Sequence, residues 1–77
     1  MREAGGVGWK RFEKFVLSEG CQFKGVEGDH NKYKKPGLAR PIIIPRYKRI
    51  PDFIIHNNLR ILGVTKKYFV EKMSKIK

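Results

Sequence analysis

Three consecutive isoleucines between two prolines constrain the fold of this chain more than any other feature: residues 41–45 read Pro-Ile-Ile-Ile-Pro. β-Branched side chains favour extended backbone and pack well on a sheet, whereas proline is confined to strand ends and edges. The segment therefore predicts a short, well-buried strand, and with it a sheet in the middle of the chain.

Two further strands are predicted before this one. The first alternates in polarity, with Cys21 and Phe23 turned inward. Glu-Gly-Asp at 27–29 predicts a tight turn, and a second strand follows over residues 30–34. Lys-Pro-Gly at 35–37 has the Pro-then-Gly order of a type II turn. These signals together predict a three-stranded antiparallel meander.

A first helix is predicted over residues 9–19, with Gly20 standing where a C-terminal cap belongs. The apolar stripe at helical spacing consists of Trp9, Phe12, Phe15 and Val16. The residues left for solvent are Lys10, Arg11, Glu13 and Lys14. An aromatic stripe can also stack on bases, but helical periodicity favours core packing. Residues 1–8, with three glycines and little to pack, predict a flexible lead-in to a domain over 9–77.

Two helices follow the sheet. The first has Asp52 as its candidate N-cap and ends at Gly63. Its inward face consists of Ile55, Leu59 and Leu62. Thr65 can cap a last short helix. The inward residues of that helix are Phe69, Met73 and Ile76, and its lysines expected in water are Lys66, Lys67, Lys72, Lys75 and Lys77.

The predicted fold is thus α+β, a single small domain with helices on one face of a three-stranded antiparallel sheet. The order α-β-β-β-α is that of the double-stranded-RNA-binding domain, here with an extra C-terminal helix. A chain of 77 residues buries only roughly 60% of its unfolded surface. Any active site should therefore lie on an open face.

The net charge of +11, from 18 Lys and Arg against seven Asp and Glu, favours a polyanionic partner. Nucleic acid comes first, since a membrane-surface role would require one long basic amphipathic helix. The sequence contains no signal peptide and no long apolar run, so we expect a soluble cytoplasmic protein without a membrane partner.

The strongest candidate for chemistry is His30, which follows the glycine turn inside a lysine-rich segment. It can take the proton of an RNA 2′-hydroxyl near pH 7, while cations offset charge building on the phosphate. Gly28 and Asp29 would shape this site. Since neighbouring strand residues point to opposite faces, Asp29 should meet His30 only if the turn continues through Asp29. The expected RNA-binding residues are Lys24, Lys32, Lys34, Lys35, Arg40, Arg46 and Lys48.

Other side chains offer less. His56 is expected on the surface of the second helix, and Cys21 as a small core residue with no disulfide partner. No motif has the ligand spacing of a metal site, so we expect cleavage without a metal or other cofactor, persisting in chelator.

Several motifs in this order resemble the HicA (YcfA-like) family of mRNA interferase toxins. The resemblance covers residues 9–73 and begins with Val-Leu at 16–17 and Gly-Cys at 20–21. It continues with Glu-Gly-Asp-His at 27–30, Tyr33, Pro-Gly-Leu at 36–38, the isoleucine strand at 40–45, the helix at 54–64 and Phe69.

This resemblance implies a double-stranded-RNA-binding-like fold and a ribonuclease that depends on His30. It also implies a HicB-like antitoxin that covers the site. Many members carry Ser before the catalytic histidine, whereas this chain has Asp29, which would orient the ring. Members often have a second histidine after the third strand, where this chain has Arg46 and Tyr47. His30 is therefore left as the sole strong catalytic candidate.

Two alternatives stay open on the sequence. A non-catalytic double-stranded-RNA-binding-like module would use the same basic face, with His30 only contacting phosphate. A structural or protein-binding domain would need a strongly acidic partner to make use of the charge.

Overall fold

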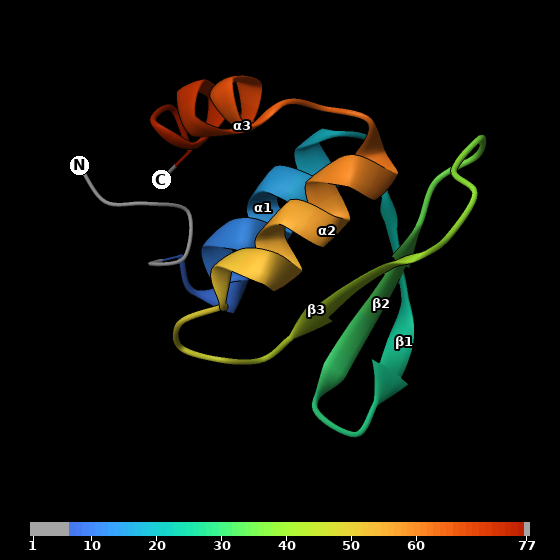
Figure 1. Cartoon of the computed structure of the whole chain (residues 1–77). Coiled ribbons are helices and arrows are strands. Elements are labelled where there is room, and N and C mark those ends of the chain that lie inside the picture. Colours follow the sequence, from blue (N-terminus) through green and yellow to red (C-terminus); the bar gives the residue numbers. More distant parts are fainter. Residues whose placement is uncertain (1–6, 77) are drawn as a thin grey trace.

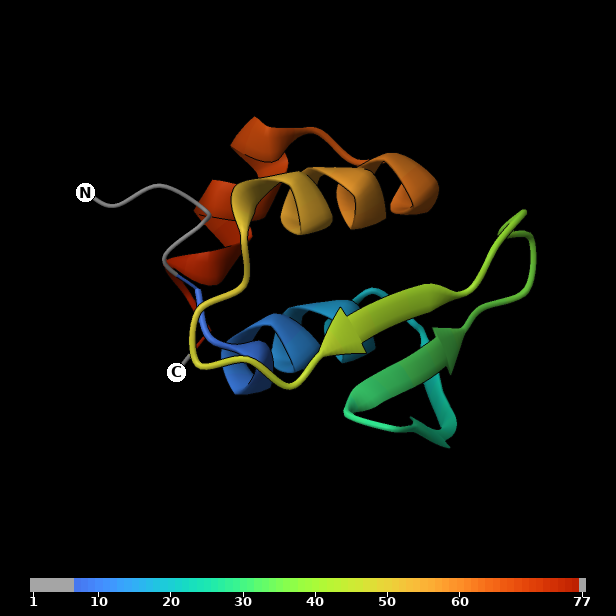
Figure 2. The ribbon, with the colours of Figure 1, turned by 60° about the horizontal axis from the view of Figure 1, so that its bottom comes forward.

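The computed structural model describes residues 7–76, which form an α+β domain with the predicted order of elements (Figure 1). The elements are α1 Trp9–Ser18, β1 Gln22–Glu27, β2 His30–Lys34, β3 Ile42–Pro45, α2 Asp52–Leu62 and α3 Lys66–Met73. The helices gather on one side of the sheet, and α2 lies at the β3 side, away from β1 (Figure 2). The predicted fold class is confirmed.

The sheet is the predicted antiparallel meander, with strand order β1-β2-β3. The turn between β1 and β2 has two central residues, of which only Gly28 has a positive φ, 61°. The type II turn after β2 is also confirmed, since Leu38 N donates to Lys35 O over 3.2 Å and Gly37 has φ 92°.

The core lies between the three helices and the inner face of the sheet. Phe12, Phe15 and Val16 of α1 are fully buried, as their spacing predicts. The ring of Phe15 meets that of Phe69 at 4.9 Å between centroids, which joins α1 to α3. The other buried apolar residues are Cys21, Tyr33, Ile42, Ile44, Ile50, Ile55, Leu59 and Met73.

The first strand departs from its predicted pattern. Phe23 pairs with buried Tyr33 and its ring lies 5.7 Å from the Tyr33 ring, but it is 50% exposed. Two features explain this exposure: β1 is the outer strand, away from the helices, and the register shifts between Phe23 and Gly25, which breaks the alternation. The prediction that Phe23 is buried is therefore wrong.

The start of α2 also differs from the prediction. Pro51 is the N-cap and Asp52 is already the first helical residue, without a capping bond from its side chain. Because proline fixes φ near its helical value, the helix can begin directly after it. Asp52 still places its carboxylate in the first turn, where the helix dipole favours a negative charge. Thr65 caps α3 as predicted, accepting from Tyr68 N over 3.0 Å.

Several charged side chains expected in water are engaged in the fold, among them Arg11, whose Nη2 donates to Met73 O over 2.9 Å. Lys72 Nζ lies 2.9 Å from Glu19 Oε2, and Glu13 Oε2 accepts a hydrogen bond from Tyr33 Oη over 2.5 Å. Lys66, Lys67 and Lys75 are exposed as predicted, whereas Lys77 lies outside the described residues.

Most of the predicted lead-in, residues 1–6, also lies outside the described residues. Val7 O accepts from Ile50 N over 2.9 Å, and Trp9 N donates to Tyr47 O over 3.1 Å. The segment just before α1 is thereby held against the loop that follows β3.

Candidate active site beside the first hairpin

His30 is presented by the turn between β1 and β2. It is the first residue of β2 and pairs with Glu27 on one side and Pro45 on the other. Its side chain is 44% exposed, on the face of β2 opposite to buried Asn31 and Tyr33. The strand therefore holds the imidazole at the surface with its backbone fixed on both sides.

The carboxylate of Asp29 lies beside this imidazole. Asp29 Oδ1 is 3.8 Å from His30 Nδ1, which is beyond hydrogen-bond distance but close enough for an electrostatic contact. Asp29 belongs to the turn and not to the strand, so strand alternation does not separate the two side chains. The sequence predicts that Asp29 meets His30 only if the turn continues through Asp29, and in the structure it does.

The loop after β3 completes the surroundings of His30. Arg46 N donates to Asp29 O over 2.9 Å, which ties this loop to the hairpin turn. The Tyr47 ring packs edge-on against the His30 ring, with centroids 6.5 Å apart and planes at 66°. Tyr47 limits the positions that the imidazole can take.

His30 opens into a groove between the sheet and α2. The groove has a volume of about 430 Å³, and the residues that line it are His30, Arg40, Pro41, Ile43, Pro45, Phe53, Ile54, Asn57, Asn58 and Ile61. The contribution of α2 was missed by the sequence prediction. The signal available was that Phe53 and Asn57 stand four residues apart, off the core face of Ile55 and Leu59.

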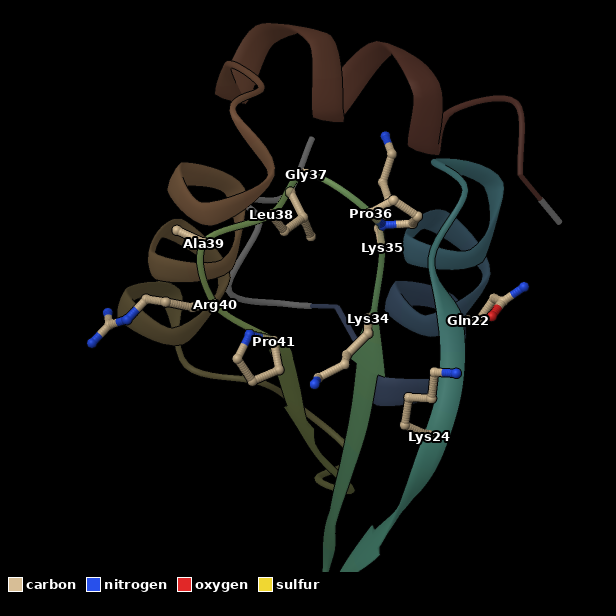
Figure 3. A pocket seen from close by; sticks show the side chains of 10 residues that line it. All are labelled: Gln22, Lys24, Lys34, Lys35, Pro36, Gly37, Leu38, Ala39, Arg40 and Pro41. Carbon is tan, nitrogen blue, oxygen red and sulfur yellow. The ribbon is translucent and has the colours of Figure 1, made fainter.

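Four of the predicted RNA-binding residues come together in a second hollow of similar volume, about 430 Å³ (Figure 3). Lys24 and Lys34 project from neighbouring strands, while Lys35 and Arg40 stand at the two ends of the loop between β2 and β3 (Figure 3). The other lining residues are Gln22, Pro36, Gly37, Leu38, Ala39 and Pro41. Arg40 and Pro41 line both hollows, so the groove of His30 adjoins the cationic hollow.

The remaining predicted RNA-binding residues line neither hollow. Lys32 lies between His30 and Lys34 on the same face of β2. Arg46 and Lys48 are exposed in the loop after β3 and line neither hollow.

The side chains judged unimportant for chemistry lie where the sequence predicts. His56 is exposed on α2, and Cys21 is buried. Burial raises the pKa of the Cys21 thiol, which leaves it unreactive. Among residues 7–76, no three His, Cys, Asp or Glu side chains gather as a metal site would require. No helix in the described part of the chain is long and apolar enough to cross a membrane.

Comparison with known protein families gives a match. The family described as the HicA toxin of bacterial toxin-antitoxin systems matches residues 9–64, from the start of α1 to just beyond α2. No curated protein and no solved structure matches the chain. The matched segment makes up more than half of the chain and contains the hairpin, the isoleucine strand and the groove beside His30. The chain therefore belongs to the HicA toxin family and is the toxin component of a toxin-antitoxin system.

Proposed function

We propose that this toxin is an mRNA endoribonuclease in which His30 is the general base. The observation that carries the proposal is the position of His30, half exposed in a groove that adjoins a hollow with four cationic side chains. A histidine that can accept a proton beside a phosphate-binding surface is what cleavage through the RNA 2′-hydroxyl requires.

The reaction would begin with a proton transfer to His30. Asp29 faces Nδ1, which leaves Nε2 to take the proton of the 2′-hydroxyl. The 2′-oxygen then attacks the adjacent phosphorus, and the bond from phosphorus to the 5′-oxygen breaks. The leaving oxygen takes a proton from water, and the hydroxide that this leaves takes the proton held by His30, so the products are a 2′,3′-cyclic phosphate and a 5′-hydroxyl.

Charge that develops on the phosphate oxygens needs a cation close to His30. Arg40 lines the same groove, and Lys32 lies two residues along the same face of β2. Either side chain would stabilise the pentacovalent phosphate electrostatically. Lys24, Lys34 and Lys35 would bind backbone phosphates farther along the RNA, which gives affinity without reading the sequence. Arg46 and Lys48 are exposed on either side of Tyr47 in the loop after β3 and would extend this surface.

Membership of the family implies an antitoxin as partner. We infer a HicB-like protein that inhibits by covering the groove of His30. The net charge of +11 favours a partner with an acidic surface. Since the substrate is mRNA, the toxin would act in the cytoplasm.

The proposal is tested by comparing wild type with His30→Ala and His56→Ala. Loss of a general base is expected to lower cleavage roughly 10²-fold to 10⁴-fold. His56→Ala removes the other histidine, exposed on α2, and should cut RNA at the wild-type rate. Purified protein and short RNA substrates give the rates, and product analysis should find cyclic phosphate and 5′-hydroxyl ends. Cleavage is expected to persist in EDTA, because the proposed steps use only side chains.

Induced expression of the same variants gives a second measurement, through growth and the integrity of total mRNA. Equal toxicity and equal cleavage by wild type and His30→Ala would remove His30 from the mechanism. RNA binding without any turnover by the wild type would instead assign the chain as a non-catalytic RNA-binding module.

A further inference from the structure

We propose that the groove beside His30 is a nucleobase subsite, in which a base next to the scissile phosphate stacks on Phe53 and is read by Asn57. The inference rests on the proposed ribonuclease activity and deepens it, because it assigns residues that would bind the substrate base. These residues come from α2, which supplies none of the predicted phosphate contacts.

The ring of Phe53 is available for stacking. Phe53 is 73% exposed, the most exposed of the large hydrophobic residues in the described part of the chain. The core face of α2 is formed by Ile55 and Leu59, so Phe53 is not needed for packing. An aromatic ring at the edge of a groove offers a base a flat apolar surface, whichever base it is.

Asn57 supplies the polar contact that reading a base requires. It follows Phe53 by four residues and lines the same groove. Its exposed amide carries one acceptor oxygen and two donor hydrogens, which can pair with the hydrogen-bonding edge of a base. The subsite thus combines a stacking surface with an edge reader, as in other single-strand RNA sites.

The neighbouring Asn58 holds this wall of the groove in place. Asn58 is buried, and its Nδ2 donates to Ile43 O over 2.9 Å. This bond joins α2 to the outer edge of β3, whose residue Ile43 lines the groove. Phe53 and Asn57 are therefore carried by a helix that is fixed relative to the strand beside His30.

Continuity with the cationic hollow favours a nucleotide as the occupant. Arg40 and Pro41 line both hollows, so an RNA backbone bound by Lys34 and Lys35 would bring its next nucleotide to the groove. A volume of about 430 Å³ lies within the usual range of small-ligand sites. We therefore infer a base as the occupant.

The test uses short single-stranded oligonucleotides with a deoxyribose backbone, which cannot be cut through a 2′-hydroxyl. An abasic site is moved along the oligonucleotide, and affinity is measured for wild type and Phe53→Ala. At one position, loss of the base should weaken binding to wild type roughly 5-fold to 150-fold, the range found for stacking on an aromatic side chain. In Phe53→Ala the same abasic site should weaken binding little, because the base has already lost the ring on which it would stack.

Two variants serve as controls. Phe53→Tyr keeps the ring and should bind like wild type. Val70→Ala removes another exposed apolar side chain, from α3, and should leave the effect of every abasic site unchanged. Asn57→Ala should flatten the base preference at a single position next to the cut, as mapped on natural RNA.

The assignment is overturned if the effects of Phe53→Ala and of every abasic site are additive, or if the oligonucleotides do not bind. It is also overturned if Phe53→Ala changes neither the affinity for the oligonucleotides nor the cleavage pattern. The groove would then be assigned to contact with a protein partner. Failure of the wild type to cut RNA would contradict the proposed ribonuclease activity. The binding measurements with wild type, Phe53→Ala and abasic oligonucleotides test the base subsite separately, because these strands cannot be cut.

Discussion

Strand β2 carries both His30, the proposed general base, and Tyr33, whose hydroxyl makes the main polar contact of the core. His30 and Tyr33 belong to β2 but point to opposite faces of the sheet, as an odd spacing in a strand requires. Tyr33 Oη accepts from Asn31 Nδ2 over 3.0 Å and donates to Glu13 Oε2 over 2.5 Å. Burial, together with the hydrogen bond to Glu13, raises the pKa of Tyr33, so its hydroxyl stays neutral and donates. The open and the buried face of β2 are thus fixed by the same backbone.

For the single residue Tyr33, we predict that Tyr33→Phe lowers the stability of the fold. The substitution leaves the buried Asn31 Nδ2 without its acceptor, and should lower the free energy of unfolding by about 1–3 kcal/mol. Urea denaturation measures the change. Tyr68→Phe is the matched control: it also removes a hydroxyl bonded to a carboxylate, that of Glu19, but at an exposed site. Its cost should be smaller, and equal costs would contradict the role given to the buried contacts.

At the scale of elements, α3 is attached to the end of α1 by a small polar cluster as well as by packing. Glu19 Oε2 accepts from Lys72 Nζ over 2.9 Å and from Tyr68 Oη over 2.7 Å. Burial alone would raise the pKa of the Glu19 carboxyl, but the bonds from Tyr68 and Lys72 outweigh it, and the pKa is lowered. The hydrogen bond to Glu19 raises the pKa of Lys72 in turn.

This lowered pKa predicts a pH-dependent contribution to stability. A carboxyl whose pKa is lower in the folded state stabilises the fold above its unfolded pKa, about 4.3 for Glu. The contribution is lost as the pH falls through the lower, folded value. Wild type should therefore melt at a higher temperature than Glu19→Gln at pH 7, and the difference should shrink below about pH 4.3. A difference that is constant with pH would show that the charge of Glu19 is irrelevant.

Glu71→Gln gives the matched control for this experiment. Glu71 is an exposed carboxylate on α3, and its side chain takes no part in the Glu19 cluster. Its replacement should change the melting temperature little across the same pH range.

In the whole molecule, the fold gathers part of the net charge of +11 at one place on the surface. Lys24, Lys34, Lys35 and Arg40 surround one hollow, although they come from two strands and a loop. Binding of single-stranded RNA should therefore weaken with salt, with a slope of log K against log salt near −0.7 for each neutralised phosphate.

The contribution of the hollow can be measured from that slope. Lys34→Gln should make the slope shallower by about 0.7. Lys75→Gln removes an equal charge from an exposed site beyond the end of α3 and should leave the slope nearly unchanged. Equal changes for the two variants would mean that total charge, and not the hollow, determines affinity.

Much of the fold follows from local signals in the sequence. The Pro-Gly turn at 36–37, the hairpin turn at Gly28 and the Thr65 cap have geometries that depend on the residue itself, and the structure has all three. Helical spacing likewise identified the buried residues of α1. The exposure of Phe23 could not be predicted in this way, because the register shift in β1 depends on its pairing with β2.

In the candidate site, too, some features could be predicted from local sequence and others could not. The sequence by itself determined His30, its glycine turn and the isoleucine strand, because these depend on residue type and on neighbours in the chain. Asp29 lies beside His30 because the local turn includes Asp29, whereas the folding of the sheet was needed to bring Arg40 to one hollow with Lys24 and Lys34. Only the tertiary structure brought Phe53 and Asn57 to the groove of His30, since α2 reaches that groove by packing along β3. Phe53 and Asn57 stand more than twenty positions from His30 in the sequence, and no local pattern encodes their approach to it.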